Sequence, residues 1–305
     1  MEAPLVVGVD GSEGSLRALD WAVDEAVRHG RPLQMVHASL WERYEGTAPA
    51  GTRERPWGQV LAENILGGAV ERARNRSRAV TVTTYVAGED AAGALLRAGR
   101  SAVAVIVGSR GRSEMGDLLL GSVGLVVAAR SSCPVVVVRG DRDALEARHG
   151  RILLGVGEHD TDSPAVRFAF REAAVRKAEL DAVHTWRKPA HEPVDHPLLT
   201  RGEAPFFEHR AAETLDLAIA AATRKHPEVP VRRALVEGAP HRVLTDRSAA
   251  ADLLVLGAGH RHHWAGLQLG RAAHRALHHA ACPVAIVPQH PPEEAARETE
   301  GPTPG

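Results

Sequence analysis

Residues 107–123 combine glycines and a serine at a spacing that suits phosphate binding. Gly108 and Gly111 would let a tight turn of backbone approach a ligand with no Cβ in the way. Nine residues separate Gly111 from Gly121 and Ser122, which open the next helical pattern. The free N–H groups and the dipole at a helix start favour a phosphate, and the Ser122 hydroxyl can add a donor at the N-cap. A single glycine more often only makes a turn, but the joint placement predicts an anion-binding loop.

A carboxylate and two arginines could complete such a site. Asp10 follows the first apolar run, and its carboxylate could accept hydrogen bonds from ribose hydroxyls. The alternative is that Asp10 is a turn or helix-capping residue, because Gly11 and Ser12 follow it. Arg110 and Arg112 could supply positive charge to the glycine loop or could be merely solvated.

Short apolar runs alternate with longer helical patterns through the first half of the chain. The runs are rich in Val, Ile and Leu, which suits strands buried on both faces of a parallel sheet. The predicted strands are residues 5–9, 33–37, 80–86, 103–107 and 135–138. The predicted helices are residues 15–29, which Gly30 closes at the C-cap, and residues 58–78, 91–100 and 122–131. The fold class is therefore α/β, a doubly wound five-stranded parallel sheet whose fourth strand ends at the glycine loop.

The same pattern occurs twice. Residues 103–138 and 252–287 align without a gap at an offset of 149, with nine of 36 positions identical, and the starts of the two halves align at an offset of 147. We therefore expect two such sandwiches in tandem. The predicted boundaries are a first domain at 1–139, a charged linker at 140–150, a second domain at 151–288 and a disordered tail at 289–305.

These features together resemble the universal stress protein family. The resemblance is carried by the Gly-x-x-Gly-x9-Gly-Ser pattern, the opening Val6-Val-Gly-Val-Asp-Gly-Ser12 and the run Cys133-Pro-Val-Val-Val, and it extends over nearly the whole chain. It implies an adenine nucleotide alpha hydrolase-like fold and an adenine nucleotide of the ATP type, with or without Mg²⁺, in the first domain. It further implies that Asp10 lies near the adenosine, that the main chain of Val36 meets the adenine and that Val107 flanks the nucleoside. The implied site residues are Gly8, Val9, Asp10, Val36, Val107, Gly108, Arg110, Gly111, Gly121, Ser122 and Val123.

The second copy departs from this pattern. Gly157 stands at the position of Asp10, so the acid is missing there, although Glu158 is adjacent. Two loop glycines remain as Gly257 and Gly270, whereas His260 replaces Gly111 and Arg271 replaces Ser122. Arg271 is a cation and can still attract an anion. We expect ordinary ATP binding in the first copy only.

Histidines are concentrated in the second half of the chain. His274 and His278 are four residues apart on a predicted helix, a spacing that can chelate a metal. The His and carboxylate spacing of a catalytic zinc motif does not accompany them. A polar helix face or a pH-sensitive surface is the better interpretation, and we expect no metal site.

Three functions are compatible with the sequence. The favoured one is a stress-response or regulatory protein that binds an adenine nucleotide. A slow ATPase or adenylyl-transfer enzyme is an alternative, but the sequence has no Walker-type Gly-Lys-Ser/Thr and no triad-like spacing, so we predict no catalytic residues. The other alternative is an interaction module with a vestigial site. Residues 135–138 and 284–287 would then pair within the chain as a pseudo-dimer, and a homodimer is a further option.

Composition excludes several other classes. The chain has a formal net charge of −1 and a pI near 7.0, which argues against a general nucleic-acid binder. Cys133 and Cys282 each precede a proline and are expected to be reduced core residues. The start lacks the pattern of a signal peptide, and the longest apolar stretch, 118–129, is interrupted by glycines and a serine. We expect no membrane span and a cytoplasmic protein.

Overall fold

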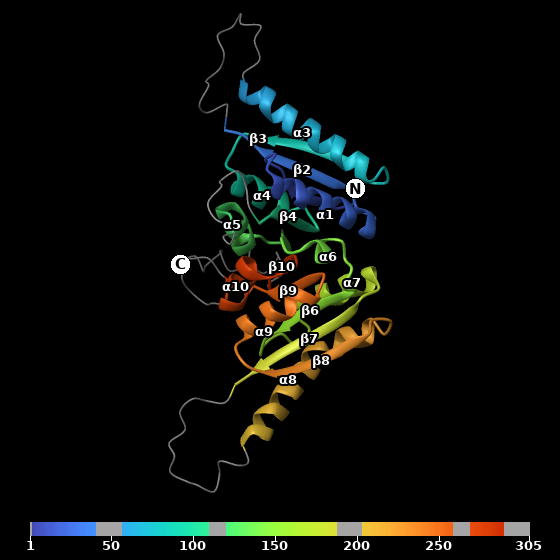
Figure 1. Ribbon diagram of the computed structural model, residues 1–305, viewed down its shortest axis with the longest axis vertical. Coiled ribbons are helices and arrows are strands. Elements are labelled where there is room, and N and C mark those ends of the chain that lie inside the picture. Colours follow the sequence, from blue (N-terminus) through green and yellow to red (C-terminus); the bar gives the residue numbers. More distant parts are fainter. Residues whose placement is uncertain (1, 41–56, 110–119, 188–202, 259–268, 290–305) are drawn as a thin grey trace, which may run out of the picture. The chain divides into compact units, whose positions relative to one another are not determined.

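The computed structural model describes residues 2–40, 57–109, 120–187, 203–258 and 269–289. The contacts divide the chain into two compact units, and within the described residues the first lies in 2–139 and the second in 140–258 and 270–289. Figure 1 shows both units, with labels on most of their helices and strands. Each unit is an α/β domain built on a parallel sheet, so the predicted fold class is confirmed.

The first unit contains a five-stranded parallel sheet. Its strands are β1 (Leu5–Gly8), β2 (Leu33–Ala38), β3 (Val82–Ala87), β4 (Ala104–Gly108) and β5 (Val135–Val138). They lie in the order β3-β2-β1-β4-β5. Every observed strand end is within two residues of the predicted end. The expected burial on both faces is wrong for β3, which is the edge strand of this sheet and has mostly exposed residues. The strand order reverses between β1 and β4, so their carboxyl ends border the crevice where such sheets bind ligands.

Helices pack on this sheet in pairs (Figure 1). They are α1 (Glu13–His29), α3 (Trp57–Arg76), α4 (Ala91–Gly99) and α5 (Ser122–Arg130). α1 packs against α3, and α4 packs against α5. The core between helices and strands includes the fully buried side chains of Leu19, Met35 and Ile106. Gly30 ends α1 in the left-handed region at φ 61°, which confirms the predicted C-cap.

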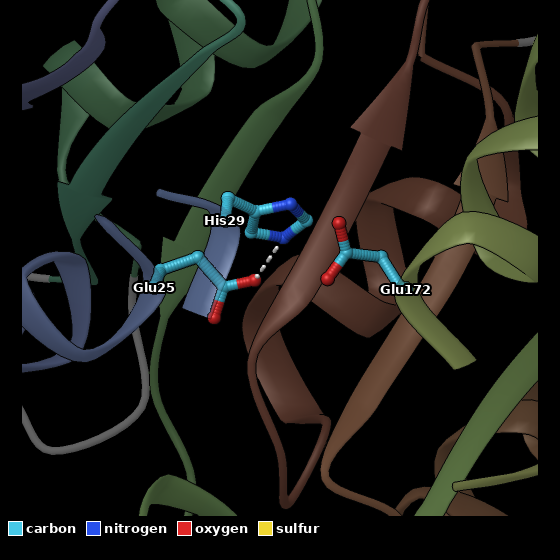
Figure 2. Close-up of side chains that lie close together, drawn as sticks. All are labelled: Glu25, His29 and Glu172. Carbon is cyan, nitrogen blue, oxygen red and sulfur yellow. Dashed lines mark hydrogen bonds and ion pairs between the residues drawn. The ribbon is translucent and has the colours of Figure 1, made fainter. Parts of the chain in front are cut away.

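The last turn of α1 carries positive charge, which interacts favourably with the negative end of the helix dipole. Glu25 links the two basic side chains of this turn. Its carboxylate accepts a hydrogen bond from Nε2 of His29 at 3.0 Å, as Figure 2 shows, and it also pairs with Arg28.

The second unit repeats the same topology in its own residues. Its strands are β6 (Arg151–Val156), β7 (Glu179–Trp186), β8 (Val231–Glu237), β9 (Leu253–Gly257) and β10 (Val284–Val287), in the order β8-β7-β6-β9-β10. All their pairings are parallel. Its helices are α6 (Arg142–Leu145), α7 (Pro164–Arg176), α8 (Glu203–Lys225), α9 (Pro240–Arg247) and α10 (Arg271–His279). The repeat found in the sequence is therefore a repeat of architecture.

The segment predicted as a linker, 140–150, packs on the second unit and contains α6. Gly140 adopts φ 100°, and a Cβ at this position would lie 2.2 Å from the carbonyl oxygen of Ala281. The next N–H, from Asp141, donates to the same carbonyl at 3.1 Å. Further along, the N–H of His149 donates to the buried carboxylate of Asp252 at 2.9 Å. These bonds fix the segment to the second unit.

Both cysteines are buried and no disulfide joins them, as the sequence predicted. Burial raises the pKa of the Cys133 thiol above its usual value, which keeps the thiol protonated at neutral pH. Among the helices that the structure describes, none combines the length and the apolar character needed to cross a membrane.

Candidate functional site

The first unit contains a cavity of about 270 Å³ at the carboxyl edge of its sheet. The cavity lies where the strand order switches, between the ends of β1, β2 and β4 and the starts of α4 and α5. Its lining residues are Gly8, Val9, Asp10, Ser15, Val36, His37, Ala38, Ala91, Leu95, Val107, Gly108, Gly121, Ser122, Val123 and Gly124.

Most of the site residues named from the sequence line this one cavity. They are Gly8, Val9, Asp10, Val36, Val107, Gly108, Gly121, Ser122 and Val123. Arg110 and Gly111 lie outside the described residues. The described ends of the glycine loop are joined, since the N–H of Gly121 donates to the carbonyl oxygen of Ser109 at 2.9 Å. This bond brings the start of α5 to the end of β4.

The start of α5 presents main-chain donors to the cavity. Ser122, Val123 and Gly124 form the first turn, whose N–H groups have no acceptor within a helix, and all three residues line the cavity. The first turn carries no acidic side chain, and within the described residues no side chain caps it. The positive end of the helix dipole therefore faces the cavity, which suits an anion.

The expected N-cap role of Ser122 is wrong. Gly121 is the N-cap, with an extended backbone at φ −64° and ψ 149°, and Ser122 is the first helical residue. The helix begins one residue earlier than an N-cap position for Ser122 requires, so Ser122 contributes a free N–H of the first turn.

Gly108 is required by packing between elements. A Cβ at this position would lie 2.5 Å from the carbonyl oxygen of Gly14, in the first turn of α1. Sequence reasoning assigned the missing Cβ to the approach of a ligand. The structure shows a backbone neighbour in that place, so the glycine is needed for α1 to begin close to the end of β4.

Asp10 is held at the cavity wall by the turn that leads into α1. Its Oδ1 accepts hydrogen bonds from the N–H of Ser12 at 2.9 Å and from the Ser12 hydroxyl at 2.6 Å. Ser12 caps α1 by accepting from the N–H of Ser15 at 3.2 Å. The turn role weighed in the sequence is therefore present, and it orients a carboxylate that also lines the cavity.

β2 continues to Ala38, one residue beyond the predicted end at His37 and two beyond Val36, whose main chain was expected to meet the adenine. The Val36 carbonyl oxygen already accepts from the N–H of Val9 at 2.9 Å. The main-chain N–H and carbonyl of Ala38 point toward β1, as those of Val36 do, because alternate residues of a strand present their main-chain groups to the same side. In a regular ladder the N–H of Ala38 would donate to the carbonyl oxygen of Val9. That oxygen instead accepts a hydrogen bond from Nδ1 of the buried His37 at 2.7 Å. Among the described residues no other main-chain group bonds to Ala38 on this side. The N–H and the carbonyl oxygen of Ala38 are therefore available as a donor and an acceptor beside the cavity.

Apolar side chains from α4 form a wall that the sequence reading missed. Ala91 and Leu95 line the cavity on one side, together with Val36 and Val107. The amphipathic pattern of residues 91–99 was visible in the sequence, but it did not reveal which residues face the strand ends. The cavity thus combines an apolar wall, a carboxylate and a row of main-chain donors, which suits a flat ring joined to an anionic group.

The corresponding edge of the second unit is built differently. The N–H of Gly157, at the repeat position of Asp10, donates to Oδ2 of Asp160 at 2.7 Å. Nε2 of Gln289 donates to Oδ1 of the same carboxylate at 3.1 Å, and it lies 1.7 Å from the position that a Cβ on Gly257 would occupy. Side chains of this unit therefore occupy the space beside Gly257. His260 lies outside the described residues.

Comparisons with known proteins agree with this architecture. The model of the Universal stress protein family matches residues 2–139 and 149–288. A universal stress protein of Mycobacterium tuberculosis is 30% identical over 291 residues, covering 93% of this chain and 97% of that protein. Two solved structures share the fold. One is a universal stress protein from Archaeoglobus fulgidus with a TM-score of 0.64 and 17% identity, covering 94% of this chain and 96% of that one. The other is a functionally unknown protein from Pseudomonas aeruginosa with a TM-score of 0.65 and 16% identity, covering 97% of this chain and 98% of that one.

Proposed function

Because this chain belongs to the universal stress protein family, we propose that its first unit binds an adenine nucleotide in the cavity at the carboxyl edge of β1 and β4. One observation carries the proposal. The uncapped start of α5 and the carboxylate of Asp10 line the same cavity, so an anion and a sugar hydroxyl can be bound together. Ligand occupancy would make the protein a regulatory binder, in keeping with its family.

The cavity residues suggest a role for each part of the nucleotide. The phosphates lie at the N–H groups of Ser122, Val123 and Gly124, where the helix dipole favours negative charge. The ribose hydroxyls donate to Asp10.

The adenine lies at the end of β2. The N–H and carbonyl of Ala38 match the acceptor and donor on the edge of the base, and Leu95 supports its face. The main-chain role expected for Val36 thus moves to Ala38 in this proposal. ATP is the proposed form because the chain carries the Gly-x-x-Gly-x9-Gly-Ser pattern that resembles the family's ATP-binding motif, and Mg²⁺ would accompany the phosphates.

The substitution Ser122→Pro provides the sharpest test of phosphate binding. Proline is favoured at the first helical position, and the extended backbone of Gly121 suits a residue before proline, so α5 keeps its structure and loses one N–H. A hydrogen bond to a charged group contributes about 1.5–3 kcal/mol, so ATP affinity falls by roughly 10- to 100-fold. Adenosine affinity stays unchanged, since adenosine has no phosphate.

Calorimetry on the full chain with ATP, ADP, AMP, cyclic AMP and adenosine measures both effects. Ser122→Ala is the matched control, because it removes only the hydroxyl, and it should retain most of the ATP affinity. An absence of adenine-nucleotide binding by the unsubstituted chain in the presence of Mg²⁺ contradicts the proposed function.

A further inference from the structure

Two helices of the second unit begin at the carboxyl edge of its sheet without negative charge in their first turns. α9 follows β8, α10 begins after β9, and the two helices pack against each other. Their N-caps are Ala239 and Gly270, and neither first turn contains an acidic residue. Within the part of the chain that is described, no side chain caps either helix. The positive ends of both dipoles are therefore uncompensated.

Cations gather at this edge. His241 and Arg242 lie in the first turn of α9, Arg271 is the first residue of α10, and Arg275 lies one turn later on the same helix face. Arg187 directly follows β7. The N–H of Gly238 donates to the carbonyl of Trp186 at 3.0 Å, which places Arg187 beside the start of α9. The four arginines are exposed.

The charges of these arginines affect the protonation of His241. Burial lowers the pKa of His241, and repulsion from Arg275, Arg242, Arg187 and Arg271 lowers it further. This repulsion agrees with the packing of α9 against α10 and with the bond from Gly238 to Trp186, which bring the arginines to one edge of the unit. Among the described residues none of the four takes part in an ion pair or a side-chain hydrogen bond, so no described side chain of the unit neutralises their charge.

The first unit has no cations at the corresponding places. At the offset of 149, Arg271 corresponds to Ser122 and Arg275 to Val126, while His241 and Arg242 correspond to Ala92 and Gly93. In contrast, the feature that would hold a ribose is absent from the second unit, because Gly157 stands at the position of Asp10 and Asp160 is engaged by Gln289. Compared with the first unit, the second unit thus has additional cations where an anion would bind, and it has no carboxylate at the position of Asp10, where a nucleoside would bind.

We propose that the second unit binds an oligophosphate group through Arg187, His241, Arg242, Arg271 and Arg275, without recognising a nucleoside. Guanidinium groups bind phosphate oxygens in a bidentate manner, and the free N–H groups at the start of α10, together with that of His241 in α9, add further donors. An oligophosphate carries enough charge to neutralise several of these cations at once, whereas a single carboxylate does not. The group belongs either to a nucleotide or to free polyphosphate.

Calorimetry with tripolyphosphate on the full chain at physiological salt tests the proposal. The double variant Arg271→Ser with Arg275→Gln should weaken tripolyphosphate binding by roughly 10- to 100-fold. Arg232→Ser, which removes an exposed arginine from β8, is the matched control and should retain the affinity. Ser122→Pro, which disables only the phosphate contacts proposed for the first unit, should retain this site, so the two proposals fail independently.

Two further measurements decide the outcome. The NMR titration of His241 should show a higher pKa with tripolyphosphate than without it, because a bound anion favours the protonated ring. ATP and GTP should displace bound tripolyphosphate equally well, and adenosine should not displace it. If nucleotides displace the bound probe as strongly as unlabelled tripolyphosphate does, the natural ligand is the phosphate chain of a nucleotide. If they displace it much more weakly, the natural ligand is free polyphosphate. Equal losses in the double variant and in Arg232→Ser, or competition by adenosine, would overturn the proposal.

Discussion

At the scale of single residues, Asp10 and Gly108 both line the cavity and also hold the local structure around it. Asp10 was open to two interpretations, a ligand-binding acid or a turn residue, and its Oδ1 makes the turn bonds while the residue lines the cavity. Gly108 lines the cavity too, but the space for its missing Cβ is taken by the backbone of Gly14. A side chain at Gly108 would therefore disturb the packing of α1 before it disturbed a ligand.

Gly108→Ala should destabilise the first unit by about 1–3 kcal/mol, because the new methyl group meets backbone atoms that cannot move aside easily. Urea denaturation followed by circular dichroism measures the change. Gly67→Ala is the matched control, since Gly67 lies within α3 and a Cβ there meets nothing within 4 Å. That variant should be more stable by about 0.5–1 kcal/mol, as expected for alanine in a helix. Equal stability of the two variants contradicts the packing role of Gly108.

At the scale of elements, the start of each helix decides what the neighbouring strand ends can bind. α1 begins directly after Ser12, so its cap and the Asp10 turn form one hydrogen-bonded unit. α7 is capped by Ser163 and starts one turn later in the repeat, so the equivalent turn is absent beside Gly157. The helix start, more than the strand, distinguishes the two copies.

Ser12→Ala should lower stability by about 1 kcal/mol through loss of the cap, and it should also weaken nucleotide binding, because Asp10 loses the hydroxyl that orients it. Ser163→Ala is the matched control, since it removes the cap of α7 and should lower stability by a similar amount. Thermal denaturation gives the stabilities and calorimetry with ATP gives the affinities. An equal effect of both variants on ATP affinity would show that Ser12 acts only through stability.

At the scale of the whole molecule, the duplication has produced two domains with the same topology and different ligand edges. The edge of the first has a cavity with a carboxylate. The edge of the second has arginines at helix starts and an Asp160–Gln289 hydrogen bond beside Gly257. We therefore expect that the two halves are not interchangeable in ligand binding.

Each chain should bind one adenosine moiety with high affinity. Asp10→Ala should abolish that binding, whereas Gly157→Asp should not create a second site, because Gln289 and Asp160 occupy the adjacent space. Calorimetric stoichiometry with adenosine or AMP measures both outcomes. Two equivalent adenosine sites in the unsubstituted chain would contradict the asymmetry.

Several features of the site could not be found from the sequence. The resemblance implied that the main chain of Val36 meets the adenine, but the ladder with β1 occupies the Val36 carbonyl and leaves Ala38 available. Ala91 and Leu95 belong to a helix whose orientation depends on how it packs on the sheet. Ser122 was expected at the N-cap position of α5, and the helix instead starts at Ser122 itself. Each error arose where a backbone register or a helix orientation, rather than a residue type, decides the contact.

The sequence by itself determined the architecture. Alternating apolar runs and helical patterns specify parallel α/β units, and the offsets of 147 and 149 specify two of them, because these signals are local and repeat along one chain. It also identified which copy keeps the acid, the glycines and the Gly-Ser at α5. Only the tertiary structure decided that these residues share one cavity, that Gly108 is held by α1, and that α9 and α10, with the arginines at their starts, pack against each other. Those contacts join residues far apart in the sequence, and their geometry depends on how helices pack against the sheet.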